Sequence, residues 1–153
     1  MFKNDTRTLF ICIGIQASGK STFCRTVLPH IKHISLDILK TRPKEKTALE
    51  EALRMQNSCV IDNTNPTREE RKKYLAPAKN ENYKTVGIYF SSKLEECISR
   101  NSLRKGKAQV PLKALLSTAK KLELPSYEEG FDALYYVTIK NNAFSIEKWN
   151  DNL

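Results

Sequence analysis

The sequence predicts an α/β fold, a three-layer sandwich in which a five-stranded parallel sheet is covered by helices on both faces. Apolar strand-like runs alternate with segments of helical periodicity along the whole chain, which is the pattern of parallel sheets. The 153 residues, 40% of them hydrophobic, are enough to enclose a core. Because no repeat, low-complexity segment or linker divides the chain, we expect residues 1–153 to form a single domain.

The predicted strands and helices follow one another in order along the chain. The strands are expected at Leu9–Ile13, His33–Ser35, Cys59–Asp62, Thr85–Phe90 and Leu134–Ile139. The helices are expected at Lys20–Leu28, Thr47–Gln56, Thr67–Asn80, Leu94–Leu103 and Leu112–Leu122. Three starts have capping-box spacing, namely Thr47 with Glu50, Thr67 with Glu70 and Ser92 with Glu95. The lysine-rich, irregular stretch after residue 100 predicts a mobile lid at about residues 100–122.

A phosphate-loop motif, G-x-x-x-x-G-K-S, extends from Gly14 to Ser21 between the first strand and the first helix. Its glycines let backbone N–H groups turn toward phosphate oxygens, and the following helix adds its positive end. Lys20 supplies a cation for the β- and γ-phosphates, and the Ser21 hydroxyl can hold Mg²⁺. The motif predicts binding of ATP with Mg²⁺. The residues expected to contact the nucleotide are Gly14, Ala17, Ser18, Gly19, Lys20, Ser21 and Thr22.

Polar residues follow the second and third strands, where ligands of a parallel sheet bind. Asp37 can accept a proton from a hydroxyl nucleophile, or it can simply cap a short helix. Asp62 closes an apolar strand, the usual place for a carboxylate that orients Mg²⁺ or its waters. Asn63 and Asn65 offer amide groups to a substrate; the alternative, an Asx-rich turn before a helix, is favoured for Asn65 and stays open for Asp62.

Two arginines mark the predicted lid. Arg100 and Arg104 are four residues apart, so one helical face can direct both at the same anion. An arginine from a closing lid stabilises the charge that develops on a transferring phosphoryl group. Each arginine taken alone can also be an ordinary surface residue.

The chain carries 26 Lys and Arg against 17 Asp and Glu, a formal net charge of +9. The basic clusters are Lys40-Arg42-Lys44-Lys46, Arg68-Arg71-Lys72-Lys73 and Arg100-Arg104-Lys105-Lys107. A triphosphate alone does not need so strong a positive field, which favours a polyanionic partner, while a solvated surface is the alternative. The longest apolar run, Leu9–Ile15, is too short to cross a membrane and ends in the phosphate loop, so neither a membrane span nor a signal sequence is expected.

The four cysteines, Cys12, Cys24, Cys59 and Cys97, lie far apart and are expected to be core side chains rather than disulfides or zinc ligands. This indicates a reducing compartment, a cytoplasm. The histidines His30 and His33 form no metal-spaced set and are interpreted as structural or surface residues. Trp149 is expected to pack the last segment against the body.

Together these residues resemble the 5′-hydroxyl polynucleotide kinase domain of the P-loop kinase superfamily. The resemblance runs from about Phe10 to Ile139. It rests on Gly14–Ser21, Asp37, the run Ile61-Asp62-Asn63-Thr64-Asn65-Pro66, Arg100-Asn101 with Arg104, Val110-Pro111, Glu123-Leu124-Pro125 and Glu129-Gly130-Phe131. The phosphate loop is shared by many NTPases, whereas the D-N-T-N-P run combined with R-N-x-x-R is much more discriminating.

The resemblance implies a P-loop kinase-type fold that transfers the γ-phosphate of ATP to the 5′-OH of DNA or RNA with Mg²⁺. It implies Asp37 as the general base and Arg104, with Arg100 nearby, as the lid cation. Two positions depart from the pattern: Ser35-Leu36 replaces an Asn-Arg pair before the base, and Lys40 replaces an arginine that contacts the acceptor phosphate in a phage member. No D-x-D signature is found, so no 3′-phosphatase activity is expected.

Three functions are consistent with these residues. The first is a polynucleotide 5′-hydroxyl kinase. The second is a kinase for a small hydroxylated metabolite, antibiotic or nucleotide sugar, which keeps every catalytic role and changes only the acceptor. The third is a nucleic-acid-binding module whose nucleotide site only regulates binding.

Overall fold

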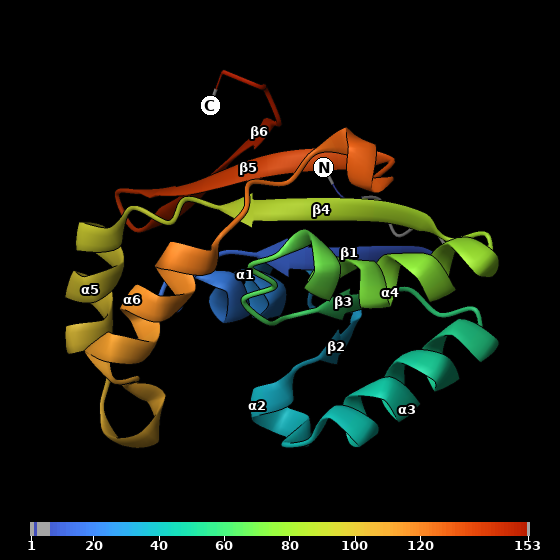
Figure 1. The fold of residues 1–153 in the computed structure, drawn as a ribbon, viewed down its shortest axis with the longest axis horizontal. Coiled ribbons are helices and arrows are strands. Elements are labelled where there is room, and N and C mark those ends of the chain that lie inside the picture. The colour runs from blue at the N-terminus through green and yellow to red at the C-terminus, as the bar shows by residue number, and fades with distance from the viewer. Residues whose placement is uncertain (1, 3–6, 153) are drawn as a thin grey trace.

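The computed structural model describes Phe2 and residues 7–152, which form an α/β arrangement with one mixed sheet between helices (Figure 1). The strand order is β2-β3-β1-β4-β5-β6, in which the first five strands are parallel and β6 is antiparallel to β5. The strands are β1 Thr8–Ile13, β2 Lys32–Ile34, β3 Cys59–Ile61, β4 Lys84–Phe90, β5 Ala133–Lys140 and β6 Ala143–Lys148. The predicted parallel α/β sheet is confirmed, with one more strand than expected.

The helices lie on both faces of the sheet and beyond one of its ends (Figure 1). The α-helices are α1 Lys20–Val27, α2 Leu36–Leu39, α3 Arg42–Arg54, α4 Arg68–Asn80, α5 Leu94–Ser102 and α6 Leu112–Lys121, and the 3₁₀ turns are Gly106–Ala108 and Tyr127–Glu129. Among the described residues, no helix has the length and apolar character needed to cross a bilayer.

The central strand β1 shows how the sequence divides the core into two layers. Successive side chains of a strand point to opposite faces. Phe10 and Cys12 pack toward α1 with Phe23, whereas Leu9 and Ile11 pack toward α3 and α4. Because both faces are covered, every residue of β1 is buried.

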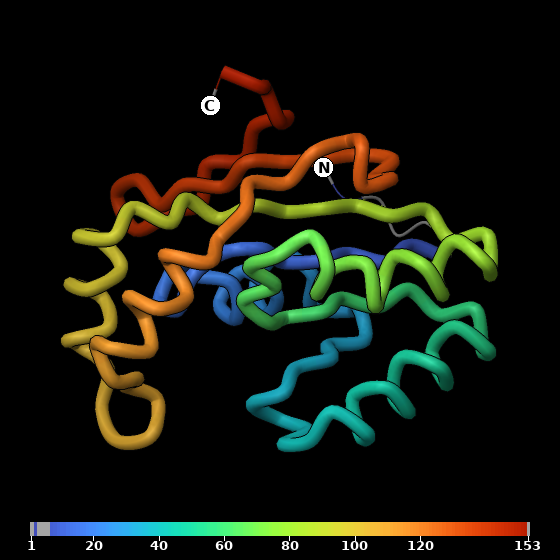
Figure 2. The backbone as a smooth tube through the Cα atoms, viewed as in Figure 1, coloured from blue at the N-terminus to red at the C-terminus, as the bar shows by residue number. Residues whose placement is uncertain are grey.

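Helices α5 and α6 lie side by side beyond the carboxyl end of β4, and Figure 2 shows them as a separate lobe at the left of the molecule. A small apolar cluster of Ile15, Cys97 and Leu115 joins this lobe to the loop that follows β1. The lobe therefore stands against the edge of the sheet where ligands of such folds bind.

Strand β6 is the element that the sequence analysis missed. It forms a hairpin with β5 through Asn141 and Asn142, whose φ angles of 51° and 60° are those of a two-residue turn of type I′. The usual sequence signal for this turn is Asn-Gly, and Asn-Asn is a weaker one. Trp149 follows β6 and packs against Tyr89 and Tyr136 with ring centroids 5.5 and 6.3 Å away, which confirms its predicted packing role.

Helix α3 begins at Arg42 rather than at the predicted Thr47. Thr41 is its N-cap and accepts a hydrogen bond from the Lys44 amide at 3.4 Å, with Pro43 in the first turn. Thr47 lies inside the helix, where its hydroxyl donates to the Pro43 carbonyl oxygen. Thr47 and Glu50 therefore match the capping-box spacing by chance, because they lie inside a helix that begins five residues earlier.

The other two predicted caps have opposite outcomes. Thr67 caps α4 by accepting from the Glu70 amide at 3.2 Å, as predicted. Ser92 caps no helix: its hydroxyl donates to the Phe90 carbonyl and accepts from the Ile15 amide at 3.1 Å. Ser92 thus fastens the loop after β4 to the loop after β1.

All four cysteines are free and buried, which confirms that they are core residues. The sulfur atoms of Cys12 and Cys24 lie 3.6 Å apart between β1 and α1. Burial raises the pKa of the Cys12 thiol well above its usual value, and the neighbouring Cys24 adds to that shift. The Cys12 side chain therefore remains a protonated thiol at neutral pH.

Arg71 was expected to belong to a basic surface, but its side chain is fully buried. Its guanidinium donates to both carboxylate oxygens of Glu129, at 2.7 and 3.0 Å. The remaining nitrogen donates to the carbonyl oxygens of Asn65 at 2.9 Å and Glu123 at 3.1 Å. Arg71 consequently joins three segments of chain and is not available to a polyanion.

We predict that Arg71→Met destabilises the protein, because it leaves the buried Glu129 carboxylate without its cation. The free energy of unfolding, measured by urea denaturation, should fall by about 3–5 kcal/mol. Lys73→Met, on the exposed side of α4, should change it by less than about 0.5 kcal/mol. Equal midpoints for the two variants would contradict the assigned role of Arg71.

Candidate functional site

The loop between β1 and α1 has the geometry of an anion-binding turn. Gly19 adopts a left-handed conformation with φ of 100° at the N-cap of α1, which glycine reaches without strain. At Gly14 a Cβ atom would approach the Ser18 hydroxyl to 2.8 Å, so the loop closes tightly on itself. The Gly14 amide donates to the Thr64 carbonyl oxygen at 3.0 Å, which anchors the loop to the segment after β3.

Lys20 is the first residue of α1, and its side chain turns back into this loop rather than into solvent. Its ammonium donates to the Ile15 carbonyl oxygen at 2.8 Å and to the Ser18 hydroxyl at 3.3 Å. Burial lowers the pKa of Lys20 from its usual value, and the charge of Asp62 opposes part of that shift. The ammonium is thus held inside the loop near the N-terminus of α1, where it can neutralise an anion.

Asp62 is the hub of the site. Its Oδ2 atom accepts hydrogen bonds from the Ser21 hydroxyl and from His33 Nε2, both at 2.7 Å. Burial opposes ionisation of Asp62, but the hydrogen bonds from His33 and Ser21 outweigh it, and the pKa of the carboxyl lies below its usual range. The Asp62 side chain therefore carries its negative charge at neutral pH.

The residues present fit a magnesium ion. Mg²⁺ prefers hard oxygen ligands and keeps several of its waters, and Ser21 and Asp62 offer a hydroxyl and a carboxylate next to the loop. The thiols of Cys12 and Cys24 lie within 4.8 Å of the Asp62 carboxylate, but soft ligands of this kind do not suit Mg²⁺. Ser21 and Asp62 are the sequence-predicted metal ligands, and the structure places them in contact.

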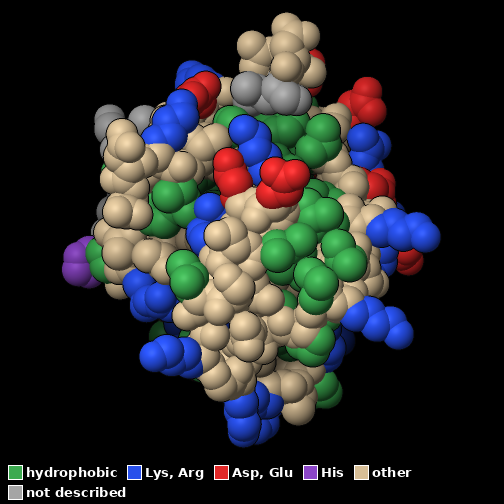
Figure 3. Space-filling model, turned by 90° about the vertical axis from the view of Figure 1, so that its left-hand side faces the viewer, with side chains coloured by type: hydrophobic (Ala, Val, Ile, Leu, Met, Phe, Trp, Pro, Cys, Tyr) green, Lys and Arg blue, Asp and Glu red, His purple; other side chains and the backbone are tan. Residues whose placement is uncertain are grey.

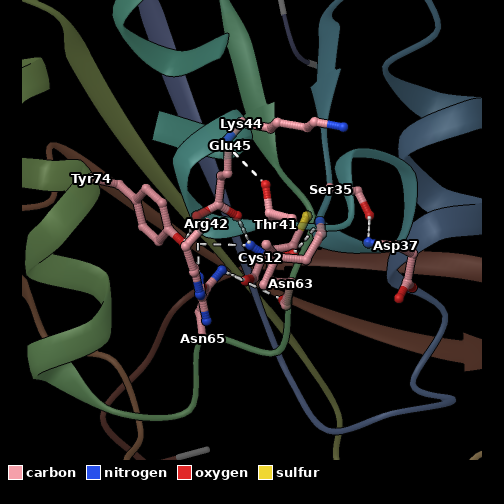
Figure 4. Close-up of polar contacts among 11 residues, drawn as sticks. Cys12, Ser35, Asp37, Thr41, Arg42, Lys44, Glu45, Asn63, Asn65 and Tyr74 are labelled. Carbon is pink, nitrogen blue, oxygen red and sulfur yellow. Dashed lines mark hydrogen bonds and ion pairs between the residues drawn. The ribbon is translucent and has the colours of Figure 1, made fainter. Parts of the chain in front are cut away.

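Asp37 lies on α2, directly after β2. The cap of this short helix is Ser35, whose hydroxyl accepts from the Asp37 amide at 3.2 Å (Figure 4). The Asp37 side chain is exposed, and its carboxylate makes no hydrogen bond or ion pair with the part of the chain that the structure describes. The alternative that Asp37 serves as a cap is therefore wrong. Lys40 ends the same helix and is also exposed.

Asn63 belongs to a polar network that holds α2 and α3 together (Figure 4). Its Oδ1 atom accepts from the Leu36 amide at 3.0 Å, and its Nδ2 atom donates to Glu45 at 2.7 Å and to the Tyr74 hydroxyl at 3.4 Å. The buried Glu45 carboxylate also accepts from Tyr74 at 2.8 Å and from Arg42 at 3.1 Å. The predicted substrate contact of Asn63 has no support in this geometry, because its amide is committed to the framework.

Asn65 is also a framework residue. It is buried, its φ is 44°, and its Nδ2 atom donates to the Cys12 carbonyl oxygen at 2.7 Å. The Asn65 carbonyl oxygen accepts from Arg71 on the other side. The segment after β3 is therefore braced from both sides, and the side-chain amide nitrogen of Asn65, like that of Asn63, is committed to the framework.

The two lid arginines are placed differently. Arg100 Nε donates to the Ala17 carbonyl oxygen at 2.7 Å, so its guanidinium lies against the phosphate loop. Arg104 is exposed; its guanidinium donates to the Ala108 carbonyl oxygen at 3.4 Å, and its positive charge contributes to the lowered pKa of Lys20. The structure thus brings Arg100 into the site and leaves Arg104 at the rim of the α5–α6 lobe.

Gln16 provides a second link between this lobe and the loop, which sequence analysis did not identify. Its Nε2 atom donates to the Thr118 hydroxyl of α6 at 3.0 Å, while its Oε1 atom is buried without a partner among the described residues. Figure 3 looks onto this end of the molecule, where Lys and Arg side chains project around exposed hydrophobic ones. The exposed leucines of the lobe are Leu94, Leu103, Leu112 and Leu116.

We predict that Asn63→Ala loosens the attachment of α2. The Leu36 amide and the buried Glu45 carboxylate lose a partner, so the free energy of unfolding should fall by about 1–3 kcal/mol. Hydrogen exchange of the Leu36 amide, followed by NMR, should accelerate. Asn80→Ala at the exposed end of α4 is the matched control and should leave both quantities unchanged; an unaltered Leu36 exchange rate in Asn63→Ala would count against the network.

We predict an alkaline loss of stability that depends on Tyr74. Burial and the hydrogen bond to Glu45 raise the pKa of Tyr74 to about 12, above the value of about 10 for an unfolded chain. Because the folded state holds this proton more tightly, its stabilisation is complete below pH 10 and is lost between about pH 10 and 12, by about 2–3 kcal/mol. Urea denaturation across this range should show a shallower pH dependence for Tyr74→Phe, whereas the exposed Tyr127→Phe should retain the wild-type slope.

Comparison with known proteins agrees with this geometry. A family model described as AAA domain matches residues 9–125, which include the loop, Asp37, Asp62 and both lid arginines. The chain is 32% identical over 153 residues to a bifunctional polynucleotide phosphatase/kinase of Schizosaccharomyces pombe, covering 97% of this chain and 38% of that protein. It is 34% identical over 145 residues to a putative bifunctional polynucleotide phosphatase/kinase of Acanthamoeba polyphaga mimivirus, covering 90% of this chain and 34% of that protein.

A solved structure shares the fold at low sequence identity. Chaetomium thermophilum Kti12 in complex with ADP-AlF3 superposes with a TM-score of 0.65 at 14% identity, covering 85% of this chain and 88% of that one. The chain spans little more than a third of the two curated relatives it matches. The extent of the family match and the strand–loop–helix geometry around Lys20 agree, and the chain belongs to the AAA domain family with a P-loop kinase fold.

Proposed function

We propose that this chain is an ATP-dependent kinase that transfers the γ-phosphate to a 5′-hydroxyl end of DNA or RNA. The observation that carries the proposal is the placement of a free carboxylate, Asp37, at the edge of the sheet that holds Lys20 and the Ser21–Asp62 pair. A donor site and an unpaired base at one edge are the minimum that phosphoryl transfer requires. The names of both curated relatives support a polynucleotide as acceptor.

The donor half of the site follows from the loop geometry. The amides at the N-terminus of α1 and the Lys20 ammonium bind the phosphates of ATP, and the residues that contact it are Gly14 and Ala17 to Thr22. Ser21 and Asp62 would hold Mg²⁺, which would supply positive charge beside the phosphates of the nucleotide. Arg100, already against the loop, and Arg104, at the rim of the α5–α6 lobe, stabilise the charge on the phosphoryl group as it transfers.

The acceptor half is built from exposed residues. Asp37 accepts the proton of the 5′-hydroxyl as its oxygen attacks the γ-phosphorus and ADP leaves. Lys40 lies at the end of the same helix and attracts the first phosphate of the acceptor as a point charge. The net charge of +9 draws a polyanion to the surface from a distance. The free thiols suit a reducing compartment, and we therefore place the activity in the cytoplasm. We also propose that residues 1–153 form one domain.

The proposal is tested by incubating the protein with γ-labelled ATP, Mg²⁺ and 5′-hydroxyl oligonucleotides of DNA and RNA. Label should transfer to the 5′ end. Asp37→Asn should lower kcat by about 10²–10⁴-fold with nucleotide binding intact, and Lys20→Ala should abolish transfer by weakening nucleotide binding. Lys73→Ala on the exposed side of α4 should leave kcat at the wild-type value. Labelling that never exceeds the Lys20→Ala background on any end would overturn the proposal.

The dependence on salt separates a polynucleotide from a small acceptor. Binding of a polyanion releases the counterions condensed on it, so the apparent affinity falls steeply as the salt concentration rises. The apparent affinity for a small neutral acceptor depends little on salt. Titration of the oligonucleotide KM between 50 and 200 mM salt measures this slope. A regulatory nucleic-acid-binding module would instead bind oligonucleotides normally and show no difference between Asp37→Asn and wild type.

A further inference from the structure

We infer that His33 is a positioning residue of the metal–nucleotide site: its Nε2–H group holds the Asp62 carboxylate so that this group keeps the orientation needed by Ser21 and Mg²⁺. This inference rests on one part of the proposed function, namely that the loop between β1 and α1 binds a nucleotide. It concerns the donor half, and it does not depend on which hydroxyl accepts the phosphate. Sequence analysis gave His33 no functional role.

The contact is short and its direction is determined by chemistry. His33 Nε2 and Asp62 Oδ2 are 2.7 Å apart. A carboxylate oxygen can only accept, so the hydrogen lies on Nε2, and this holds whether the imidazole is neutral or protonated. The side chain of Asp62 is 2% exposed and that of His33 is 23% exposed. A charge-assisted hydrogen bond in such a setting is little weakened by solvent.

The register of the sheet explains why these two residues meet. His33 pairs with Val60 across the parallel strands β2 and β3, and the Asp62 amide donates to the Ile34 carbonyl oxygen at 2.8 Å. Side chains two residues apart share a face of a strand, so Asp62 lies on the same face as Val60 and His33. Val60 packs with α1, and this is therefore the face on which Ser21 approaches.

Both donors converge on one oxygen of Asp62. Ser21 and His33 occupy Oδ2, and Oδ1 accepts no hydrogen bond from Phe2 or residues 7–152. The carboxylate is thus held by two hydrogen bonds from different elements, with one oxygen left for the hydration shell of the metal. Lys20 also attracts Asp62 electrostatically. Without the His33 donor, the carboxylate would have one fixed bond and would be free to turn toward this ammonium, which the phosphates need.

This role predicts an effect on metal affinity that a purely structural role would not produce. Groups that orient a metal ligand typically change metal affinity by about 10–100-fold when they are removed. His33→Leu keeps the bulk of the side chain and removes the donor. His33→Gln restores an N–H group at similar reach, and His33→Asn places its amide too far from Asp62. His30→Leu, at an exposed position two residues before β2, is the matched control.

The test measures Mn²⁺ binding to each variant in the presence of ADP by electron paramagnetic resonance, with no acceptor present. We expect the Kd for Mn²⁺ to rise about tenfold in His33→Leu and His33→Asn, to stay within about threefold of wild type in His33→Gln, and to be unchanged in His30→Leu. Binding of ADP without metal should be the same in all four variants. In the kinase assay the Mg²⁺ concentration for half-maximal rate should shift in the same order.

Two outcomes would overturn the inference. One is a wild-type Mn²⁺ affinity in His33→Leu or His33→Asn, and the other is an equal loss in His33→Gln, which would show that shape rather than the donor matters. If His33→Leu does not fold, the comparison of His33→Asn with His33→Gln decides the question. A failure to label any oligonucleotide would reject the proposed acceptor while leaving the Mn²⁺ result unaffected.

Discussion

The carboxylate of Asp62 is the point on which the candidate site depends. It joins β3 to α1 through Ser21 and to the edge strand β2 through His33, so that one ionised group connects three elements of the fold. A buried carboxylate is costly unless it is hydrogen-bonded, and here both donors lie at 2.7 Å. The same bonds that make its burial tolerable also direct it to the place where a metal ion would bind.

The segment that follows Asp62 connects neighbouring elements of the fold through hydrogen bonds. Asn63 reaches forward to α2 and α3, whereas Asn65 reaches back to β1 and is held from behind by Arg71. Each amide satisfies buried polar groups that would otherwise be unpaired. As a result, the element that carries Asp37 and the loop that carries Lys20 are fixed relative to each other through a few hydrogen bonds.

The features that could be predicted from the sequence are those set by short stretches of chain. The phosphate loop is one, because strand, glycines, lysine and helix follow one another directly, and the apolar runs of the parallel strands are another. The burial of Arg71 was within reach as well, since Arg71, Tyr74, Leu75 and Ala78 have the spacing of one helical face. The prediction that Arg71 belongs to a basic surface cluster did not take this helical periodicity into account.

The features that sequence analysis missed depend on pairings between distant segments. His33 meets Asp62 only because β2 and β3 adopt one particular register, and a shift by one residue would place the histidine on the other face. Asn63 and Asn65 were correctly identified as polar residues at the edge of the sheet, but an amide does not reveal whether its partner is a ligand or the protein itself. The burial of Glu45 beside Asn63 has the same origin.

The two halves of the site differ in burial, and the difference has a physical consequence. The donor side uses buried groups such as Lys20 and Asp62. The electrostatic interactions of these charges are strong because the protein around them has a low dielectric constant. The acceptor side presents Asp37 and Lys40 to solvent, where single charges are weak and screened. A site of this form can hold a compact triphosphate rigidly while leaving space for a long chain to approach. Its affinity for the acceptor must then come from many weak charges acting together, which the excess of basic residues provides.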